Sequence, residues 1–231
     1  MEIRRLVWLL ACLLNAENTF GVPIFDDYQG LTSVRDNIDP SVSVLICIGN
    51  SISIITKSDL NDKYPMLTEI YLDHNLLAIV ERGCFKGTAL KYISLSYNLL
   101  TVFSDFREVK DTLESINLEG NKIQKISTTE VDYLTKISNI VLSDNPLTQL
   151  PQLTLFHPSL IWLNLNGIEL DCCSLTIWLK RKPVTLGLLM NIRPCSYPPE
   201  WNMTKWESIT DDMLLQNTCA TRSCARNKKL H

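Results

Sequence analysis

The middle of the chain carries apolar residues in a pattern that repeats five times. The copies start at Leu67, Leu90, Leu113, Ile137 and Leu160, with spacings of 23, 23, 24 and 23 residues. Counted from these starts, columns one, four, six and eleven are apolar at all 20 positions. Alternation followed by a turn is typical of a short strand that buries one face. We therefore predict five short parallel strands, stacked about 4.8 Å apart.

An asparagine fills the ninth column of the first four copies, at Asn75, Asn98, Asn121 and Asn145. Here the chain turns away from the strand, and backbone N–H and C=O groups are left facing inward. A side-chain amide carries both a donor and an acceptor, so a stack of asparagines can satisfy those groups. The fifth copy has Ile168 in this column, and there we expect the stack to give way to a cap.

The pattern L-x-x-L-x-L-x-x-N-x-L resembles the signature of the leucine-rich repeat superfamily. The repeats proper cover residues 67–170. The resemblance implies an α/β fold, namely a right-handed leucine-rich repeat solenoid with a parallel concave sheet, an irregular convex side and a cap at each end.

A weaker copy of the repeat at 41–52 is interpreted as a capping strand, within an N-terminal cap region placed at 22–66. Extracellular members of the family usually pair a cysteine in this strand with one upstream. Once a signal peptide is removed, no cysteine precedes Cys47 in this chain. We expect Cys47 to be a buried apolar residue.

Cysteines gather after the fifth repeat, in a C-terminal cap assigned to 171–219. Four cysteines allow three pairings, which the sequence leaves open. The region resembles the cysteine-rich flank that ends secreted leucine-rich repeat proteins, and this resemblance implies the bonds Cys172–Cys195 and Cys173–Cys219.

Other apolar residues are assigned by spacing. Leu175, Trp178 and Leu179 are expected to face the last repeat from one short helix. On the return segments the phenylalanines at 85, 103 and 106 are expected in the core, whereas Cys84 is expected to face outward on the convex side.

The first residues have the layout of a secretory signal peptide, placed at 1–16 with an end that extends to 21 at most. Arg4 and Arg5 form a basic head before an apolar run of nine residues. Nine residues are too few for a hydrocarbon core that needs about 20. No second long apolar run follows, so we expect a secreted, extracellular protein with no membrane span.

Export gives meaning to two further features. Asn202-Met-Thr204 is an N-glycosylation sequon, so we predict a glycoprotein. Residues 220–231 form a basic tail with four basic and no acidic residues. This tail is interpreted as a disordered end or, alternatively, as a tether whose Cys224 bonds a partner chain.

Composition narrows the classes of function. A net charge of −3 argues against nucleic-acid binding driven by bulk positive charge. The 3 histidines leave little material for an imidazole base or a histidine zinc site, so we expect no metal and no cofactor. Asp73 and His74 are adjacent on a predicted strand and would point apart, and an open sheet would leave Asp73 hydrated. We therefore expect no catalytic residues and no enzyme.

The outward positions of the strands would line the concave face, which is the candidate binding site. Exposed aromatic rings among amides and carboxylates are typical of protein-binding surfaces; the alternative is an idle solvated face. The candidate residues are Glu69, Tyr71, Tyr92, Tyr97, Asn117, Asn139, Trp162 and Asn164. The sequence thus predicts a non-catalytic recognition module for an extracellular protein or glycan. The alternative is an assembly subunit of an extracellular complex, joined through Cys224.

Overall fold

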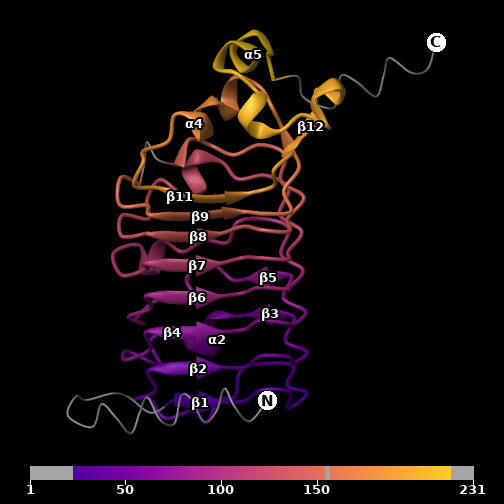
Figure 1. Cartoon of the computed structure of the whole chain (residues 1–231). Helices are drawn as coiled ribbons and strands as arrows, with labels where there is room; N and C mark the ends of the chain where they lie inside the picture. The colour runs from indigo at the N-terminus through magenta and orange to yellow at the C-terminus, as the bar shows by residue number, and fades with distance from the viewer. Residues whose placement is uncertain (1–22, 154–156, 220–231) are drawn as a thin grey trace, which may run out of the picture.

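The computed structural model describes residues 23–153 and 157–219 (Figure 1). They form an elongated stack of coils that ends in a helical cap. The signal peptide predicted at 1–16 and the tail at 220–231, with Cys224, lie outside the described residues.

Eight parallel strands form one sheet along the stack, in the order β1-β2-β4-β6-β7-β8-β9-β11. They are β1 (Pro23–Phe25), β2 (Val44–Ile46), β4 (Glu69–Tyr71), β6 (Tyr92–Ser94), β7 (Ser115–Asn117), β8 (Asn139–Val141), β9 (Trp162–Leu165) and β11 (Gly187–Met190). The five strands predicted from the repeats are β4, β6, β7, β8 and β9. The strand expected in the weaker copy is β2, and the solenoid prediction is confirmed.

The strands pair in one continuous register, with third-column residues side by side. Glu69 pairs with Tyr92, Tyr92 with Ser115, Ser115 with Asn139, and Asn139 with Trp162. Neither β1 nor β11 was predicted, and they extend the sheet by one strand at each end.

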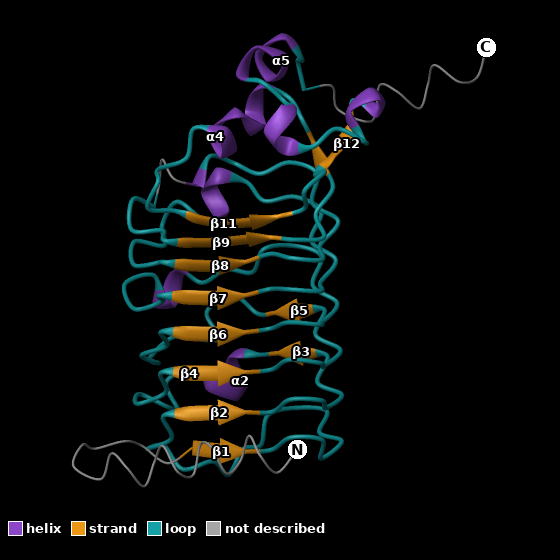
Figure 2. Cartoon of the chain, viewed as in Figure 1, coloured by secondary structure: helices purple, strands orange, loops and turns teal. Residues whose placement is uncertain are grey.

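The opposite side of the coils is irregular (Figure 2). A second, two-stranded sheet pairs β3 (Ile54–Ile55) with β5 (Ile79–Val80). The return segments otherwise hold single helical turns, α2 (Lys57–Leu60), η1 (Arg107–Val109) and η2 (Thr128–Glu130). A coil of 23 or 24 residues leaves no room for a longer helix after its strand and two turns.

The apolar columns form the core, and no residue of these columns is more than 4 % exposed. Burying each such side chain stabilises the fold by about 1.5–3 kcal/mol. The three phenylalanines are buried as predicted, with the ring of Phe106 5.8 Å from Phe85 and 5.5 Å from Phe103.

The outward orientation expected for Cys84 is wrong, because this residue is fully buried beside Phe85. Both residues lie in a run of turns, where consecutive side chains need not alternate as they do on a strand. Cys84 and Cys47 are free thiols, and burial raises the pKa of each to about 12. Cys47 is buried in the core as expected.

The ninth-column asparagines form a buried ladder. Each side chain accepts a hydrogen bond from the preceding coil and donates another to it. Asn98 Oδ1 accepts from Leu77 N at 2.9 Å, and its Nδ2 donates to Leu72 O at 2.9 Å. Asn75, Asn121 and Asn145 repeat this geometry. The asparagines therefore tie neighbouring coils together where the main chain leaves the sheet.

The ladder has an additional rung at each end. Asn50 accepts from the backbone N–H groups of Gln29 and Leu31 at the N-terminal end. At the other end Asn191, beyond β11, accepts from Gly167 N at 3.0 Å and donates to Ile168 O at 3.4 Å. Asn191 thus bonds the turn of the fifth coil, at the backbone groups of its eighth and ninth columns rather than at the eleventh- and sixth-column groups that Asn98 satisfies.

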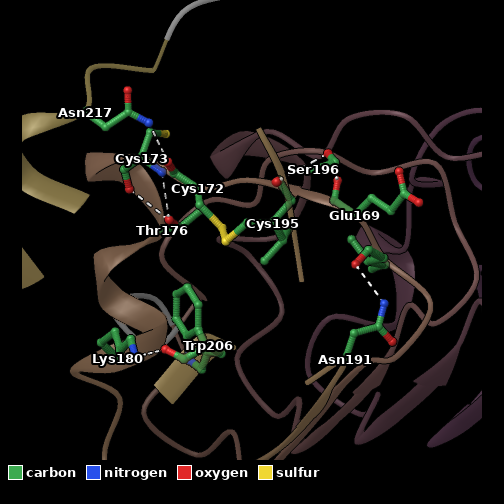
Figure 3. Close-up of a disulfide and its surroundings, with 12 residues drawn as sticks. Glu169, Cys172, Cys173, Thr176, Lys180, Asn191, Cys195, Ser196, Trp206 and Asn217 are labelled. Atoms are coloured by element: carbon green, nitrogen blue, oxygen red, sulfur yellow. Dashed lines mark hydrogen bonds between the residues drawn. A yellow bond between two sulfur atoms is a disulfide. The ribbon is translucent and has the colours of Figure 1, made fainter. Parts of the chain in front are cut away.

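The C-terminal cap covers the last coil (Figure 1), and Figure 3 shows a disulfide of this cap with its surroundings. The disulfides are Cys172–Cys195 and Cys173–Cys219, the pairing that the family resemblance implies. Asn217 Nδ2 donates to Cys172 O at 2.6 Å, which ties the segment that leads to Cys219 to the first disulfide. The cap elements are β10 (Leu170–Asp171), η3 (Ser174–Thr176), α4 (Ile177–Lys180), β12 (Cys195–Tyr197), η4 (Pro199–Trp201), η5 (Trp206–Ser208) and α5 (Asp211–Gln216).

The buried position predicted for one apolar residue of the cap is wrong. Trp178 and Leu179 are buried as expected, but Leu175 is 57 % exposed. The segment begins with the 3₁₀ turn η3 before α4 starts at Ile177. A 3₁₀ turn has three residues rather than 3.6, so the phase of a continuous α-helix does not apply to Leu175.

An ion pair holds the N-terminal end, where many relatives would have a disulfide. Asp26 follows β1 at the level of Cys47, in the core column, and is 3 % exposed. Its Oδ1 lies 2.8 Å from Arg35 Nη2, while its Oδ2 has no hydrogen-bond partner among the described residues. Arg35 is therefore the cation that compensates a buried carboxylate.

The ladder predicts a large stability difference between two asparagine variants. Asn98→Leu should lower the free energy of unfolding by about 3 kcal/mol, because Leu77 N and Leu72 O lose their partner in the interior. Asn202→Gln should change it by less than about 0.5 kcal/mol, because Asn202 is exposed. Urea unfolding followed by circular dichroism measures both. Equal stabilities would show that the ladder does not bear on folding.

The N-terminal ion pair predicts a rescue. Arg35→Met should destabilise the protein by about 2 kcal/mol or more, because it leaves the Asp26 carboxylate buried without a cation. Combining it with Asp26→Leu should restore most of the loss, since leucine is the usual residue of this core column. Unfolding curves of both single variants and the double variant give the coupling energy. If Arg35→Met were as stable as the parent, the pair would not hold this end.

Candidate ligand-binding face

The concave face is lined by the outward side chains of the eight-stranded sheet. Its character changes along the stack because each coil contributes a different third and fifth residue. Val44 and Ile46 occupy the outward positions of β2 but are buried. Tyrosines and carboxylates follow on the next strands, and serines and asparagines occupy the middle. Apolar groups return at the C-terminal end around Trp162.

A tyrosine pair occupies the N-terminal half of the face. The rings of Tyr71 and Tyr92 lie 5.0 Å apart and are tilted by 35°. Tyr71 donates its hydroxyl proton to Glu69 Oε2 at 2.8 Å. Burial raises the pKa of Tyr71, and the bond to Glu69 raises it further. Burial also raises the pKa of Tyr92. Both phenols therefore remain protonated, and the one O–H donor of Tyr71 is already used by Glu69.

Asp73 lies beneath this pair and is not hydrated, contrary to the expectation from an open sheet. It is 8 % exposed, and its Oδ1 accepts hydrogen bonds from the hydroxyls of Ser94 and Ser96 on the next coil. These serines come close enough because third- to seventh-column residues of adjacent coils lie side by side. The carboxylate therefore fastens β4 to β6 under the face.

Three aromatic side chains lie in the eighth column, which forms the rim of the face. Tyr28, His74 and Tyr97 have φ values of 54°, 54° and 53°, a conformation that non-glycine residues seldom adopt. The His74 and Tyr97 rings are stacked, 4.6 Å apart and 5° from parallel. Tyr97 donates to Glu119 Oε1 at 3.0 Å, and this bond raises the pKa of Tyr97. The sharp turn into the ladder thus fixes these side chains at the edge of the face.

Glycines in the same column make room for the rings. A Cβ atom on Gly120 would lie 2.6 Å from the Tyr97 ring, and one on Gly49 would lie 2.2 Å from the Tyr28 ring. Both glycines also have positive φ. Tyr28 and Tyr97 therefore each rest against the glycine of the following coil.

The three candidate asparagines occupy the middle of the face, and each already forms a hydrogen bond within the protein. Asn117 Oδ1 accepts from Glu119 N, and Asn164 Oδ1 accepts from Asn166 N. Asn139 Nδ2 donates to Ser138 Oγ at 3.2 Å. Seven of the eight candidate residues lie on the strands and their turns as outward side chains, and Tyr97 lies at the rim.

The C-terminal end of the face includes strand β11, which sequence reasoning missed. Trp162 is 42 % exposed and covers Gly187 of β11, where a Cβ atom would lie 2.5 Å from the indole. Leu189, also from β11, is 44 % exposed, and Ile161 is 56 % exposed. The signal that could have revealed β11 is a partial repeat at 186–191, with alternate apolar residues followed by Asn191.

Among the described residues, neither a cluster of metal-binding side chains nor a membrane-spanning helix is present. Within 23–153 and 157–219, no group of three or more His, Cys, Asp or Glu side chains could hold a metal ion. In the same ranges, no helix has the length and apolar character needed to cross a bilayer.

Comparisons with known proteins agree with this architecture. A family profile described as "Leucine rich repeat" matches residues 65–123. Tsukushi of Gallus gallus is 31 % identical over 133 residues, which cover 55 % of this chain and 36 % of that protein. Leucine-rich repeat-containing protein 66 of Homo sapiens is 34 % identical over 100 residues, which cover 42 % of this chain and 11 % of that protein.

The chain thus aligns with well under half the length of either relative. The family profile, over residues 65–123, covers the first two repeats and the strand segment of the third, which are described above. With its stacked repeats and its disulfide-bonded end, the chain is a leucine-rich repeat protein with a cysteine-rich C-terminal cap.

Proposed function

We propose that the protein is a secreted, non-catalytic recognition module that binds an extracellular protein through its concave face. The observation that carries this proposal is a continuous face on which aromatic rings are half-exposed and held in place. Tyr71 and Tyr92 are packed against each other, Tyr97 is stacked on His74, and Trp162 rests on Gly187.

Preorganised aromatic rings suit recognition because few rotors remain to be frozen on binding. Tyrosine and tryptophan are enriched among interface residues whose truncation weakens binding most. The rings here are fixed by neighbours on adjacent coils, so their positions depend on the stack rather than on a mobile loop.

The extent of the face favours a large ligand. Tyr92 and Trp162 occupy the same column and are separated by three strand spacings, about 14 Å along the stack. One small metabolite would not reach both rings. A folded protein or an extended polypeptide would.

The same face supports a non-catalytic role. Asp73 accepts hydrogen bonds from two serines, while the His74 ring is stacked on Tyr97. A triad requires the carboxylate to orient the imidazole and the imidazole to activate the hydroxyl. The carboxylate and the imidazole have structural tasks here instead.

Export and glycosylation belong to the same proposal. The basic and apolar start of the chain is that of a secretory signal, and two disulfides suit an oxidising compartment. Asn202 of the sequon is exposed beside η4, in the cap and away from the concave strands. A glycan at Asn202 would leave the face open.

Substitutions at the two ends of the face test the proposal. The secreted protein is screened against an array of extracellular proteins and glycans, and affinities of the hits are measured by surface plasmon resonance. Tyr92→Ala and Trp162→Ala should each weaken binding by about 2 kcal/mol, roughly 30-fold. Their melting temperatures should stay near that of the parent, because neither residue occupies a core column.

Ile79→Ala is the matched control, since Ile79 is 56 % exposed on β5 in the second sheet. It should bind like the parent. A folded double variant, Tyr92→Ala with Trp162→Ala, that binds every hit at full strength would remove the concave face from the proposal.

A further inference from the structure

The charges of the repeat array are unevenly distributed. Residues 67–170 contain 12 acidic and 8 basic residues. Columns two, three and five, on the strands, and columns seven and eight, at the edge of the face, together hold 5 of these acidic residues and 1 basic residue. They are Glu69, Asp73, Glu114, Glu119, Asp144 and Lys91. The remaining 7 acidic and 7 basic residues balance each other on the other surfaces. The whole net charge of the array therefore lies on the candidate binding face.

The carboxylates of this face are poorly compensated. Glu69 and Glu119 accept hydrogen bonds from the neutral hydroxyls of Tyr71 and Tyr97. Among the described residues, no lysine or arginine forms an ion pair with either carboxylate. Lys91 lies 3.8 Å from Glu114, and both of these side chains are more than half exposed, so that pair is weak.

Several acidic side chains outside the concave face have a cation partner. Asp105 contacts both Arg82 and Arg107, Glu81 lies within reach of Lys57, and Asp62 of the N-terminal cap bonds Lys86. The deficit of cations is thus a property of the concave face rather than of the whole surface.

Aromatic side chains adjoin the uncompensated carboxylates. Glu69 accepts a hydrogen bond from the hydroxyl of Tyr71, whose ring packs on Tyr92. Glu119 accepts one from the hydroxyl of Tyr97, whose ring is stacked on His74 and rests on Gly120. A lysine or arginine that pairs with either carboxylate therefore also meets a tyrosine hydroxyl, whose oxygen can accept a hydrogen bond, and its aliphatic stem can pack on the neighbouring ring.

We infer that the concave face binds a basic protein segment. Its lysine or arginine side chains sit at the Tyr71–Glu69 and Tyr97–Glu119 clusters, and an apolar side chain of the same segment packs on Ile161, Trp162 and Leu189. This inference rests on the proposed function and specifies the chemistry of the partner. Sulfated and carboxylated glycans are excluded because their charges would meet uncompensated carboxylates at close range.

A displayed library of random 12-residue peptides, panned on the full-length secreted protein, tests the inference without a known ligand. The selected peptides should contain lysine and arginine at least twofold more often than the unselected library. Their affinity should fall about tenfold or more between 50 and 300 mM NaCl, because charge pairing on an exposed face is screened by salt.

Two charge-neutralising double variants identify the surface. Glu69→Gln with Glu119→Gln should weaken the selected peptides at least tenfold. Glu200→Gln with Glu207→Gln, which removes the same charge from the exposed C-terminal cap, should leave their affinity within twofold. Tyr92→Ala reports independently whether a given peptide occupies the concave face.

The outcomes separate this inference from the proposed function. Acidic or neutral peptides that lose binding in Tyr92→Ala would overturn the inference and leave the proposed function standing. Retention on heparin at 150 mM NaCl that Tyr92→Ala abolishes would also overturn the inference, because a polyanion would then occupy the face. Peptides that ignore Tyr92→Ala, or a library that yields no binder, would count against both.

Discussion

The structure depends on one hydrogen-bonding arrangement, the asparagine ladder that joins each coil to the coil before it. A solenoid coil cannot bury its apolar columns alone, because each coil has a hydrophobic surface on both sides. Stacking buries the columns, but it also buries main-chain groups at the turn that leaves the sheet. These groups are satisfied by Asn50, Asn75, Asn98, Asn121 and Asn145. Asn191 bonds the turn of the last repeat at other backbone groups.

The same constraint shapes the binding face. Because every coil must turn sharply into the ladder, the eighth residue takes a left-handed conformation at Tyr28, His74 and Tyr97. That conformation lays their rings along one edge of the sheet, where Tyr28 and Tyr97 rest against glycines of the following coils and His74 is stacked on Tyr97. The positions of the candidate recognition residues therefore follow from the requirement to satisfy buried backbone groups. The ends need separate solutions, namely the Asp26–Arg35 pair and the two disulfides.

Most of the array could be predicted because its information is local and repeated. Columns such as Ile70, Ile93 and Ile116 fix the strands, the register and the outward face together. The ends were harder, since β1 and β11 have no full repeat and form only because an edge strand is present to pair with. Burial of Cys84 and exposure of Leu175 depend on turns that break simple periodicity. Asp73 was misjudged because its serine partners lie on the next coil, and the charge segregation becomes apparent only once the faces are assigned.

Native-state hydrogen exchange tests the role of the ladder most directly. The amides of Ile52, Leu77, Leu100 and Ile123 donate to asparagine side chains and lie outside the strands of the main sheet. If the ladder joins the coils into one cooperative unit, these amides should exchange only through global unfolding, as slowly as the amides of β6 and β7. Exchange of these four amides as fast as that of exposed turns would contradict the account.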